Sequence, residues 1–363
     1  MNQPGSANAI PVIRVLLVDD SAISLELLAR MLATTPDIKV VGRAHDGVEA
    51  LALIEQVRPD VICTDLHMPH MDGLALTQAL MSRHPLPILV VSVSVQDDQK
   101  HNIFAILEAG ALDILAKPRG GIDGNFGVVA NDLITKIRIL AGVKIIGRRK
   151  ANEKLVSKPA ASALALNGTP GVARMIGIGA STGGPQAFDA ILRQLPADFA
   201  VPLVCVQHIA QGFMAGLVDW LAGNCKIRVC TAQEGKTPQA GSAYFPPDDR
   251  HIEVDASGRF RCSRAMAVSG HRPSVDIAFG SLARCYGAAA VGVLLTGMGK
   301  DGAQGLLDIR RAGGLTLVQD EESSVVFGMP GSAIELGAAR HVLPLEQVGP
   351  ALRSLDTRGA ATT

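Results

Sequence analysis

The sequence contains few aromatic residues and no excess of charge of either sign. Aromatic residues make up 3% of the 363 residues, and 34 basic residues balance 34 acidic ones, so the formal net charge is zero. Proteins that bind nucleic acid usually show clustered Lys and Arg, and stacking on bases needs aromatic side chains. The basic cluster that the chain does have, residues 144–150, lies in a stretch with the composition of a linker. We therefore expect no nucleic-acid partner.

The chain also lacks paired cysteines, a signal-like N-terminus and long apolar runs. None of its six cysteines forms a C-x-x-C pair, and several lie inside apolar stretches, which is typical of buried thiols in a reducing compartment. No charged segment precedes an apolar core at the N-terminus, and no apolar run approaches the roughly 18 residues of a membrane helix. We expect a cytoplasmic protein without direct membrane insertion, and a monomer as its simplest oligomeric state.

The length and the 48% of apolar residues are sufficient for about two domains. Residues 1–143 alternate short apolar runs with amphipathic segments, a pattern that predicts an α/β domain of five βα units with a parallel sheet. The expected strands are residues 12–18, 40–41, 61–63, 88–91 and 113–116. The expected helices are residues 22–32, 47–56, 74–83, 97–108 and 125–140.

This alternation stops and then resumes. Residues 144–173 are basic and rich in Ala and Ser without sustained periodicity, which is typical of a linker. Over residues 174–350 longer apolar runs return and predict a second, doubly wound α/β domain with a mostly parallel sheet. The runs that suggest strands there are residues 173–176, 201–206, 288–295 and 315–318. Residues 351–363 are expected to form a disordered tail.

Acidic side chains follow two strands of the first domain. Asp19 and Asp20 end the first strand, and Asp65 ends the third. These carboxylates would repel one another unless a hard cation such as Mg²⁺ neutralised them. With Ser92 just past the fourth strand and Lys117 just past the fifth, the set suits phosphoryl transfer. Alternatively, Asp19 and Asp20 only cap the helix that follows them.

Residues 12–140 resemble the receiver domain of bacterial response regulators. The resemblance rests on V-D-D-S at 18–21, D-x-x-M-P-x-M-D-G at 65–73, Ser92 and K-P at 117–118. It implies that Asp65 accepts a phosphoryl group from a sensor histidine kinase, and that Asp19 or Asp20 holds Mg²⁺ together with Asp65. It also implies that Lys117 and Ser92 sense the phosphoryl oxygens.

Two positions depart from the common receiver pattern. Ile114 stands where many receivers have an aromatic switch residue, so the relay that follows phosphorylation differs in detail from theirs. His67 lies two residues after Asp65, beside the acyl phosphate in such domains. We hypothesise that His67 alters the lifetime of this phosphate, and equal dephosphorylation rates of the wild type and His67→Glu would refute the idea.

The second domain contains a glycine-rich turn with the sequence G-I-G-A-S-T-G-G-P at residues 177–185. Gly179 and Gly183 flank Ser181 in the G-x-S-x-G spacing of a nucleophile elbow. Glycines permit the sharp turn, and a following helix, expected over residues 188–195, offers free N–H groups to an oxyanion. The same pattern is compatible with a phosphate-binding loop or with a turn that has no chemistry.

A serine nucleophile requires a base and a carboxylate that orients the base. His208 follows the run 201–206, at the distance of one βαβ crossover beyond Ser181, and Asp301 lies in a glycine-rich loop after the run 288–295. Alternatives to His208 in this half are His251, His271 and His341. The chain order Ser, His, Asp differs from the order in α/β-hydrolases, so we do not expect that fold.

Residues 174–345 resemble the catalytic domain of the chemotaxis protein-glutamate methylesterases, the CheB family. The motifs that carry the resemblance are G-A-S-T-G-G-P at 179–185, Q-H at 207–208, P-P-D-D-R-H at 246–251, H-R-P-S-V-D at 271–276, L-T-G-M-G-x-D-G at 295–302 and G-M-P-G-S-A at 328–333. The resemblance implies Ser181 as nucleophile, His208 as general base and acid, and Asp301 as the residue that orients it. It further implies that the Met298 N–H binds the oxyanion, that Thr182 helps to hold the histidine, and that the esterase site needs no cofactor.

The implied reaction is hydrolysis of glutamate methyl esters on methyl-accepting chemoreceptors, with release of methanol, together with deamidation of glutamines. Because a receiver precedes the esterase, we expect phosphorylation to activate an enzyme that the receiver otherwise blocks. The alternative is a non-catalytic module in which the receiver serves as a phosphate sink or docking unit. A DNA-binding response regulator is poorly supported, since no helix-turn-helix-like segment follows the linker.

Overall fold

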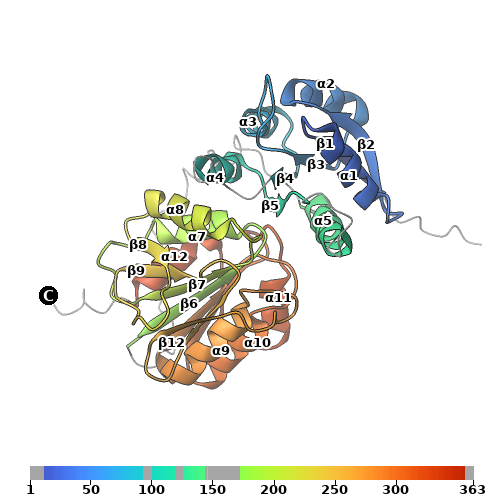
Figure 1. The fold of residues 1–363 in the computed structure, drawn as a ribbon. Coiled ribbons are helices and arrows are strands. Elements are labelled where there is room, and N and C mark those ends of the chain that lie inside the picture. The colour runs from blue at the N-terminus through green and yellow to red at the C-terminus, as the bar shows by residue number, and fades with distance from the viewer. Residues whose placement is uncertain (1–11, 93–99, 119–125, 144, 146–171, 356–363) are drawn as a thin grey trace, which may run out of the picture. The chain divides into compact units, whose positions relative to one another are not determined.

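The computed structural model describes residues 12–92, 100–118, 126–143, 145 and 172–355 (Figure 1). Among these, residues 12–92 and 109–145 form one compact unit, and residues 100–108 and 172–355 form the other. The predicted linker, residues 144–173, lies almost entirely outside the described residues. No helix in the described part of the chain combines the length and hydropathy that crossing a bilayer requires.

The first unit contains a five-stranded sheet in the order β2-β1-β3-β4-β5, and every pairing in it is parallel. The strands are β1 (Ile13–Val18), β2 (Ile38–Ala44), β3 (Val61–Thr64), β4 (Ile88–Ser92) and β5 (Asp113–Ala116). The helices that alternate with them are α1 (Ala22–Leu32), α2 (Gly47–Val57), α3 (Gly73–Arg83), α4 (Lys100–Ala109) and α5 (Phe126–Ala141). The five predicted βα units are therefore confirmed, although most of α4 belongs to the second compact unit.

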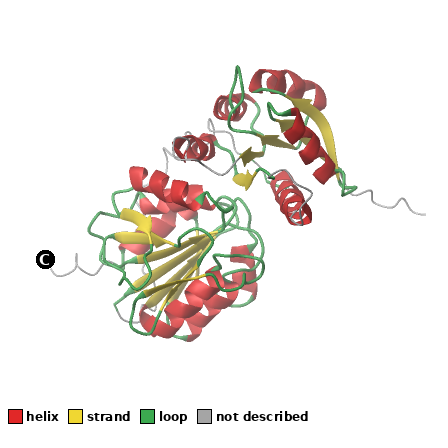
Figure 2. Ribbon diagram, in the orientation of Figure 1, coloured by secondary structure: helices red, strands yellow, loops and turns green. Residues whose placement is uncertain are grey.

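The second unit contains a seven-stranded sheet in the order β14-β13-β12-β6-β7-β9-β8, again with parallel pairings, and a separate antiparallel hairpin (Figure 2). The sheet strands are β6 (Met175–Ala180), β7 (Leu203–Gln207), β8 (Arg228–Thr231), β9 (Ser242–Phe245), β12 (Ala290–Leu294), β13 (Leu315–Gln319) and β14 (His341–Leu343). The hairpin strands are β10 (His251–Val254) and β11 (Phe260–Ser263).

Helices cover both faces of this sheet (Figure 1). One face carries α9 (Val275–Tyr286), α10 (Ala303–Arg311) and α11 (Met329–Glu335), with the short 3-10 helix η2 (Gly287–Ala289) after α9. The other face carries α7 (Gly184–Leu192), α8 (Met214–Asn224) and α12 (Leu345–Arg353). This is the doubly wound α/β architecture that the sequence predicts.

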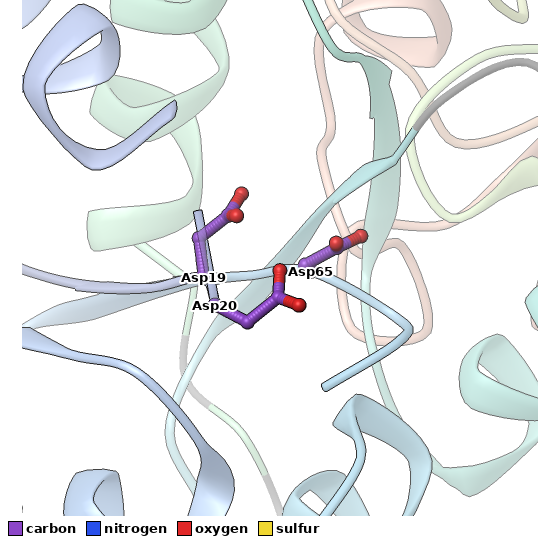
Figure 3. Close-up of side chains that lie close together, drawn as sticks. All are labelled: Asp19, Asp20 and Asp65. Atoms are coloured by element: carbon purple, nitrogen blue, oxygen red, sulfur yellow. The ribbon is translucent and has the colours of Figure 1, made fainter. Parts of the chain in front are cut away.

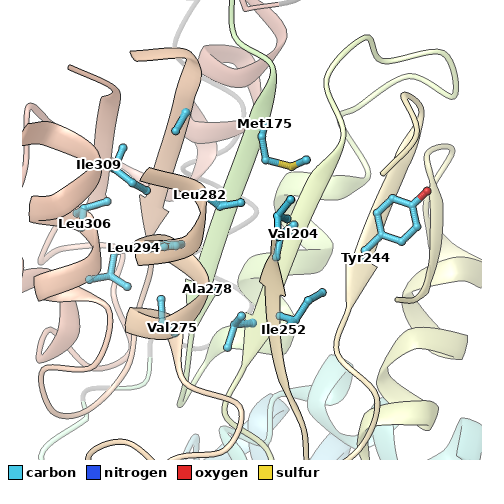
Figure 4. Packing of buried hydrophobic residues seen from close by; sticks show 14 of the residues in the cluster. Met175, Val204, Tyr244, Ile252, Val275, Ala278, Leu282, Leu294, Leu306 and Ile309 are labelled. Carbon is cyan, nitrogen blue, oxygen red and sulfur yellow. The ribbon is translucent and has the colours of Figure 1, made fainter. Parts of the chain in front are cut away.

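A buried cluster joins β6, β7 and β12 to α9 and α10, and Figure 4 shows part of it. Glycines in β6 bring α9 close to the sheet. A Cβ atom at Gly177 would lie 2.7 Å from Leu282 Cδ1, and one at Gly179 would lie 2.8 Å from Val275 Cγ2. Because carbon atoms pack at about 3.5–4.0 Å, a larger residue at either position would push α9 away. The first turn of α9 is thereby held beside the end of β6.

Among the boundaries that differ from the sequence-based expectation are three in the second unit. We expected a strand at 173–176 followed by a turn, but β6 continues to Ala180, because its glycines make room for α9 instead of breaking the strand. Helix α7 begins at Gly184 and not at residue 188, since Gly183 adopts the left-handed conformation (φ 77°) and Pro185 stands in the first turn. Residues 351–353, expected in the tail, end α12, where Leu352 is buried.

Candidate functional site

Three carboxylates meet at the C-terminal edge of the first sheet (Figure 3). Asp19 and Asp20 follow β1, and Asp65 follows β3, which pairs directly with β1. One ligand atom from each lies within 4.8 Å of the others, and no other such group of potential metal ligands occurs among the described residues. Asp19 and Asp65 are buried, whereas Asp20 is exposed. Ser21, and not either aspartate, caps α1 by accepting from the Ser24 N–H.

Lys117 supplies positive charge to this group. Its Nζ donates to Asp65 Oδ2 (2.6 Å) and lies 2.8 Å from Asp19 Oδ2, a contact without the alignment of a hydrogen bond. Burial raises the pKa of Asp19, against the effect of Lys117. Burial tends to lower the pKa of Lys117, but Asp19 and Asp65 outweigh it and raise that pKa. One ammonium leaves two of the three carboxylate charges uncompensated, and this oxygen-rich donor set fits Mg²⁺.

The other predicted receiver residues lie around this edge. Ser92 ends β4 and is buried, and its carbonyl accepts from the Lys117 N–H (2.7 Å). Ile114 is buried in β5, and the side chain of His67 is exposed. The structure thus brings Ser92 and Lys117 to the same edge of the sheet as the three carboxylates.

In the second unit, Ser181 forms a tight turn between β6 and α7. Its N–H donates to Thr296 O (3.0 Å), and its carbonyl accepts from Gly184 N (2.8 Å). The left-handed residue of the turn is Gly183, where a side chain would be both strained and within 2.6 Å of Val325 Cγ2. Ser181 itself is half-buried at the open end of the strand.

His208 follows β7, the strand that pairs with β6, and its N–H extends this pairing by donating to Ala180 O (3.0 Å). The imidazole is buried, and its Nε2 lies 2.8 Å from Asp301 Oδ2. Since an ionised carboxylate can only accept, Nε2 must carry the proton. The buried Nδ1 has no hydrogen-bond partner among the described residues and is left with its lone pair. This is the tautomer that a general base requires.

The Asp301 carboxylate lies at the N-terminus of α9. Besides His208, it accepts from Val275 N (2.7 Å), Ser274 Oγ (2.8 Å) and Asp276 N (3.1 Å). Burial alone would raise the pKa of Asp301, but the hydrogen bonds from His208, Val275 and Ser274 lower it below its usual value. A helix N-terminus also favours negative charge. Asp301 is therefore a buried, ionised group aimed at the imidazole.

Gln207, the last residue of β7, links the serine turn to the histidine. Its Nε2 donates to the carbonyls of Ser181 (2.7 Å) and His208 (2.8 Å). The motifs Q-H at 207–208 and H-R-P-S-V-D at 271–276 contain Gln207 and Ser274, but the sequence assigned neither residue a role. A polar residue at the end of an otherwise apolar strand is the available signal for Gln207, and a serine before a helix is the signal for Ser274.

The loop that contains Met298 lies against Ser181. A Cβ atom on Gly297 would stand 2.6 Å from Ser181 Cβ, so the backbone just before Met298 packs on the serine. Thr182 is buried next to Ser181, and its carbonyl accepts from Thr296 Oγ1 (3.0 Å). Both residues thus lie in or beside the serine turn.

The alternative histidines occupy other positions. His271 stacks on His208 with ring centroids 3.9 Å apart and planes inclined by 5°. His251 is buried, and its Nδ1 accepts from Ser274 N (3.2 Å). His341 belongs to β14, which β13 and β12 separate from β6. Among the four histidines of this half, His208 is the one bonded to Asp301 in the structure.

Comparison with known proteins shows two families along the chain. Residues 176–352 match the CheB methylesterase family, and residues 15–122 match the response regulator receiver domain. A protein of Methanospirillum hungatei JF-1 named protein-glutamate methylesterase/protein-glutamine glutaminase 2 is 42% identical over 348 residues, which is 96% of this chain and 99% of that protein. A protein of the same name from Anaeromyxobacter dehalogenans 2CP-C is 45% identical over 345 residues, 94% of this chain and 97% of that protein. A crystal structure of the CheB methylesterase catalytic domain of Thermotoga maritima is 36% identical and covers 50% of this chain and 98% of that chain, with a TM-score of 0.49.

Proposed function

The chain belongs to the CheB methylesterase family, with a receiver domain before the catalytic part, and we propose that Ser181, His208 and Asp301 perform its reaction. It is a protein-glutamate methylesterase and protein-glutamine glutaminase. The observation that supports the triad most strongly is the state of His208: Nε2 is bonded to Asp301, and Nδ1 keeps a lone pair at the strand end next to Ser181. Its substrates are chemoreceptors, and its phosphodonor is a sensor histidine kinase.

The first half of the reaction forms an acyl-enzyme. His208 Nδ1 takes the proton of Ser181 Oγ while Oγ attacks the side-chain carbonyl carbon of a glutamate methyl ester. When the tetrahedral intermediate collapses, the bond to the methoxy oxygen breaks, and the proton on Nδ1 passes to it to give methanol. With a glutamine substrate, the same proton goes to the amide nitrogen and ammonia leaves.

The second half restores the serine. His208 Nδ1 takes a proton from water as the water oxygen attacks the acyl carbon, and then returns it to Ser181 Oγ. The product is a glutamate side chain. Asp301 stays ionised and stabilises the imidazolium in both halves, because its four hydrogen-bond donors hold it in that form.

Groups around the serine turn would stabilise the oxyanion. We assign this role to the Met298 N–H, on a loop that packs against Ser181, with the N-terminus of α7 adding partial positive charge. Thr182 is proposed to help hold His208. Because Gly297 and Gly183 let the two backbones approach, the donor can lie close to the reacting carbon.

We propose Asp65 as the phosphoryl acceptor of the receiver, with Ser92 and Lys117 as the groups that bind the phosphoryl oxygens. Asp19, Asp20 and Asp65 would hold Mg²⁺, whose charge would offset that of the incoming phosphoryl group. Lys117 already donates to Asp65, so phosphorylation of this carboxylate must rearrange the ammonium. That rearrangement is the local event from which regulation would start.

Methanol release from methylated chemoreceptor tests the proposal in the full-length protein. We expect release by the wild type, none by Ser181→Ala, and unchanged release by the control Ser257→Ala, which alters a serine in the exposed turn between β10 and β11. Release by Ser181→Ala at the wild-type rate would exclude Ser181 as nucleophile. A wild type that binds receptor and accepts phosphate but releases no methanol would favour the non-catalytic alternative.

A further inference from the structure

The N-termini of two helices meet at the triad carboxylate. Asp301 comes shortly before α10, yet its carboxylate binds the first N–H groups of α9, at Val275 and Asp276. These groups have no partner within their own helix. Asp301 therefore serves at once as the partner of His208 and as a cap of α9.

Asp276, at the start of α9, in turn binds the start of α10. It stands in the first turn of α9, and its Oδ1 accepts from Gly305 N, in the first turn of α10, at 2.7 Å. The cap residue of α10 is Gly302, which has no side chain with which to bind this helix end. Asp276 thus supplies from a neighbouring helix the acceptor that α10 lacks.

The packing of the two helices fixes this arrangement. A Cβ atom at Gly305 would lie 2.9 Å from Asp276 O and 3.0 Å from Asp276 Cα, so the backbones touch where the carboxylate crosses. Gly302, directly after Asp301, has φ 91°, and a Cβ there would lie 2.6 Å from Leu294 Cδ1 and 2.7 Å from Val275 Cγ1, so the backbone packs closely on β12 and α9 at this point. The position of Asp301 consequently depends on how firmly the start of α10 is held.

We propose that Asp276 is a positioning residue of the esterase reaction, which holds the start of α10 and thereby the Asp301 carboxylate that orients His208. The proposal rests on the function proposed above for Ser181, His208 and Asp301. Asp276 is not expected to touch the substrate. It acts through Asp301. The Asp301 carboxylate caps α9, in whose first turn Asp276 lies, and the Asp276 carboxylate caps α10, which Asp301 precedes.

The surroundings of Asp276 are unfavourable for its negative charge. Burial raises the pKa of Asp276, and the nearby Asp301 raises it further, while the N–H groups of Gly305 and Gly302 oppose this shift. Two carboxylates side by side repel each other, and an uncharged acceptor at 276 would cap α10 without that cost. The amide variant at position 276 therefore separates the hydrogen bond to Gly305 N from the negative charge.

The test compares full-length wild type with Asp276→Ala and Asp276→Asn in steady-state methanol release. The Asn side chain keeps an oxygen that can accept from Gly305 N, whereas Ala keeps none. We expect Asp276→Ala to lower kcat by about tenfold or more with little change in KM, since small misplacements of catalytic groups carry such penalties. We expect Asp276→Asn to keep kcat within about threefold of the wild type, because the cap is preserved.

Asp255→Ala provides a matched control. Asp255 Oδ1 accepts from two backbone N–H groups, Ser257 N (2.8 Å) and Arg259 N (3.0 Å), in the turn between β10 and β11, at the opposite end of β10 from His251. This variant loses a comparable carboxylate–backbone contact and should keep the wild-type kcat. Trp220, the single tryptophan of the chain and a buried residue of α8, reports whether each variant is folded.

Wild-type kcat in folded Asp276→Ala would overturn the proposal. An equal loss in Asp276→Asn and Asp276→Ala would also overturn it, because the cap would then be irrelevant. Should Asp276→Ala not fold, Asp276→Ser, which shortens the reach towards Gly305, decides the question in the same way. Absence of methanol release by the wild type would instead contradict the proposed function, so the two failures are distinguishable.

Discussion

At the scale of single residues, the Asp301–His208 pair determines which imidazole nitrogen can act as a base. The carboxylate accepts from Nε2 and leaves Nδ1 free. An Asn side chain has both a donor and an acceptor, so it can stabilise the wrong tautomer. We predict that Asp301→Asn lowers kcat for methanol release by roughly 10⁴-fold, as the corresponding change does in serine proteases.

The control for this prediction is Asp308→Asn, in α10, which removes a carboxylate bonded only to Gln304 in the described contacts. It should keep the wild-type kcat. A loss of less than about tenfold in Asp301→Asn would show that Asp301 does not select the tautomer, because the loss expected of a triad carboxylate is far larger.

The absence of a side chain at Gly184 makes room for the side chain of Gln207. Gly184 is the first residue of α7, and the side-chain oxygen of Gln207 packs on its Cα, in the space that a Cβ would occupy. We predict that Gly184→Ala displaces Gln207 from the carbonyls of Ser181 and His208. Overpacking of this kind costs about 1–3 kcal/mol of stability, and we expect kcat to fall as well.

Gly223→Ala is the matched comparison for Gly184→Ala. Gly223 lies in α8, and a Cβ there would have no neighbour within 4 Å. This variant should gain roughly 0.5–1 kcal/mol, because Ala is favoured over Gly in a helix, and keep the wild-type kcat. Urea unfolding followed by Trp220 fluorescence, together with methanol release, measures both effects. Equal behaviour of the two variants would contradict the role given to Gln207.

At the scale of elements, the sequence allowed the strands of both central sheets to be located where apolar runs were continuous. It failed where they were not: β2, an edge strand with exposed Lys39 and Arg43, was predicted with two residues and has seven. The hairpin β10–β11 was not predicted, because its short strands alternate with charged residues.

The residues of the candidate site also divide into those that the sequence could predict and those that it could not. Ser181, His208 and Asp301 could be proposed as a triad because chemistry-bearing residues at the ends of parallel strands meet at one sheet edge. Gln207, Ser274 and Asp276 lie in motifs of the family resemblance, but their contacts could not be predicted, since these depend on which backbone groups of other elements they reach. No spacing in the sequence encodes the meeting of α9 and α10 through two carboxylates.

The helix pair α9 and α10 makes the stability of the second unit depend on pH. The pKa of Asp301 is lowered in the folded protein, so its contribution is present above the unfolded pKa and is lost as the pH falls through the folded one. The pKa of Asp276 is raised, so its contribution is present below the unfolded pKa and is lost as the pH rises through the folded one.

We therefore predict that the difference in unfolding free energy between wild type and Asp301→Asn shrinks as the pH falls from about 4, near the pKa of an unfolded Asp, to about 2, the pKa of Asp301 in the folded protein. The residue at 301 in the variant does not titrate, so the decrease comes from the wild type. Urea titrations followed by the fluorescence of Trp220, which lies in α8 of the second unit, measure the difference. A difference that does not vary with pH would contradict the lowered pKa.

At the scale of the whole molecule, the chain carries two sheets, each with a proposed reactive group at its C-terminal edge. Asp65 follows β3 of the first sheet, and Ser181 follows β6 of the second. Because a receiver precedes the esterase, we expect the two sites to be coupled. Phosphorylation can control hydrolysis only if the free energy of the active state of the esterase depends on phosphorylation of the receiver.

We predict that a small phosphodonor raises the methanol-release rate of the full-length protein, and that Asp65→Asn abolishes this response without abolishing basal activity. Coupling free energies of this kind usually correspond to about 5–150-fold. The physical origin is local: phosphorylation adds charge to a group in which one lysine faces three carboxylates, so Lys117 must change its partners. Asp60→Asn, at an exposed carboxylate of the same unit, should respond like the wild type.

The same coupling predicts the behaviour of a fragment that starts at about residue 170. If the unphosphorylated receiver restrains the esterase, the fragment should be more active than the full-length protein without phosphodonor, and the phosphodonor should not change its rate. Equal basal rates of the fragment and the full-length protein would refute restraint, and the response to phosphodonor would then have to arise by direct activation. Because the fragment lacks Asp65 but keeps Ser181, His208 and Asp301, comparing it with full-length Asp65→Asn separates the loss of the phosphoryl group from the loss of the whole receiver.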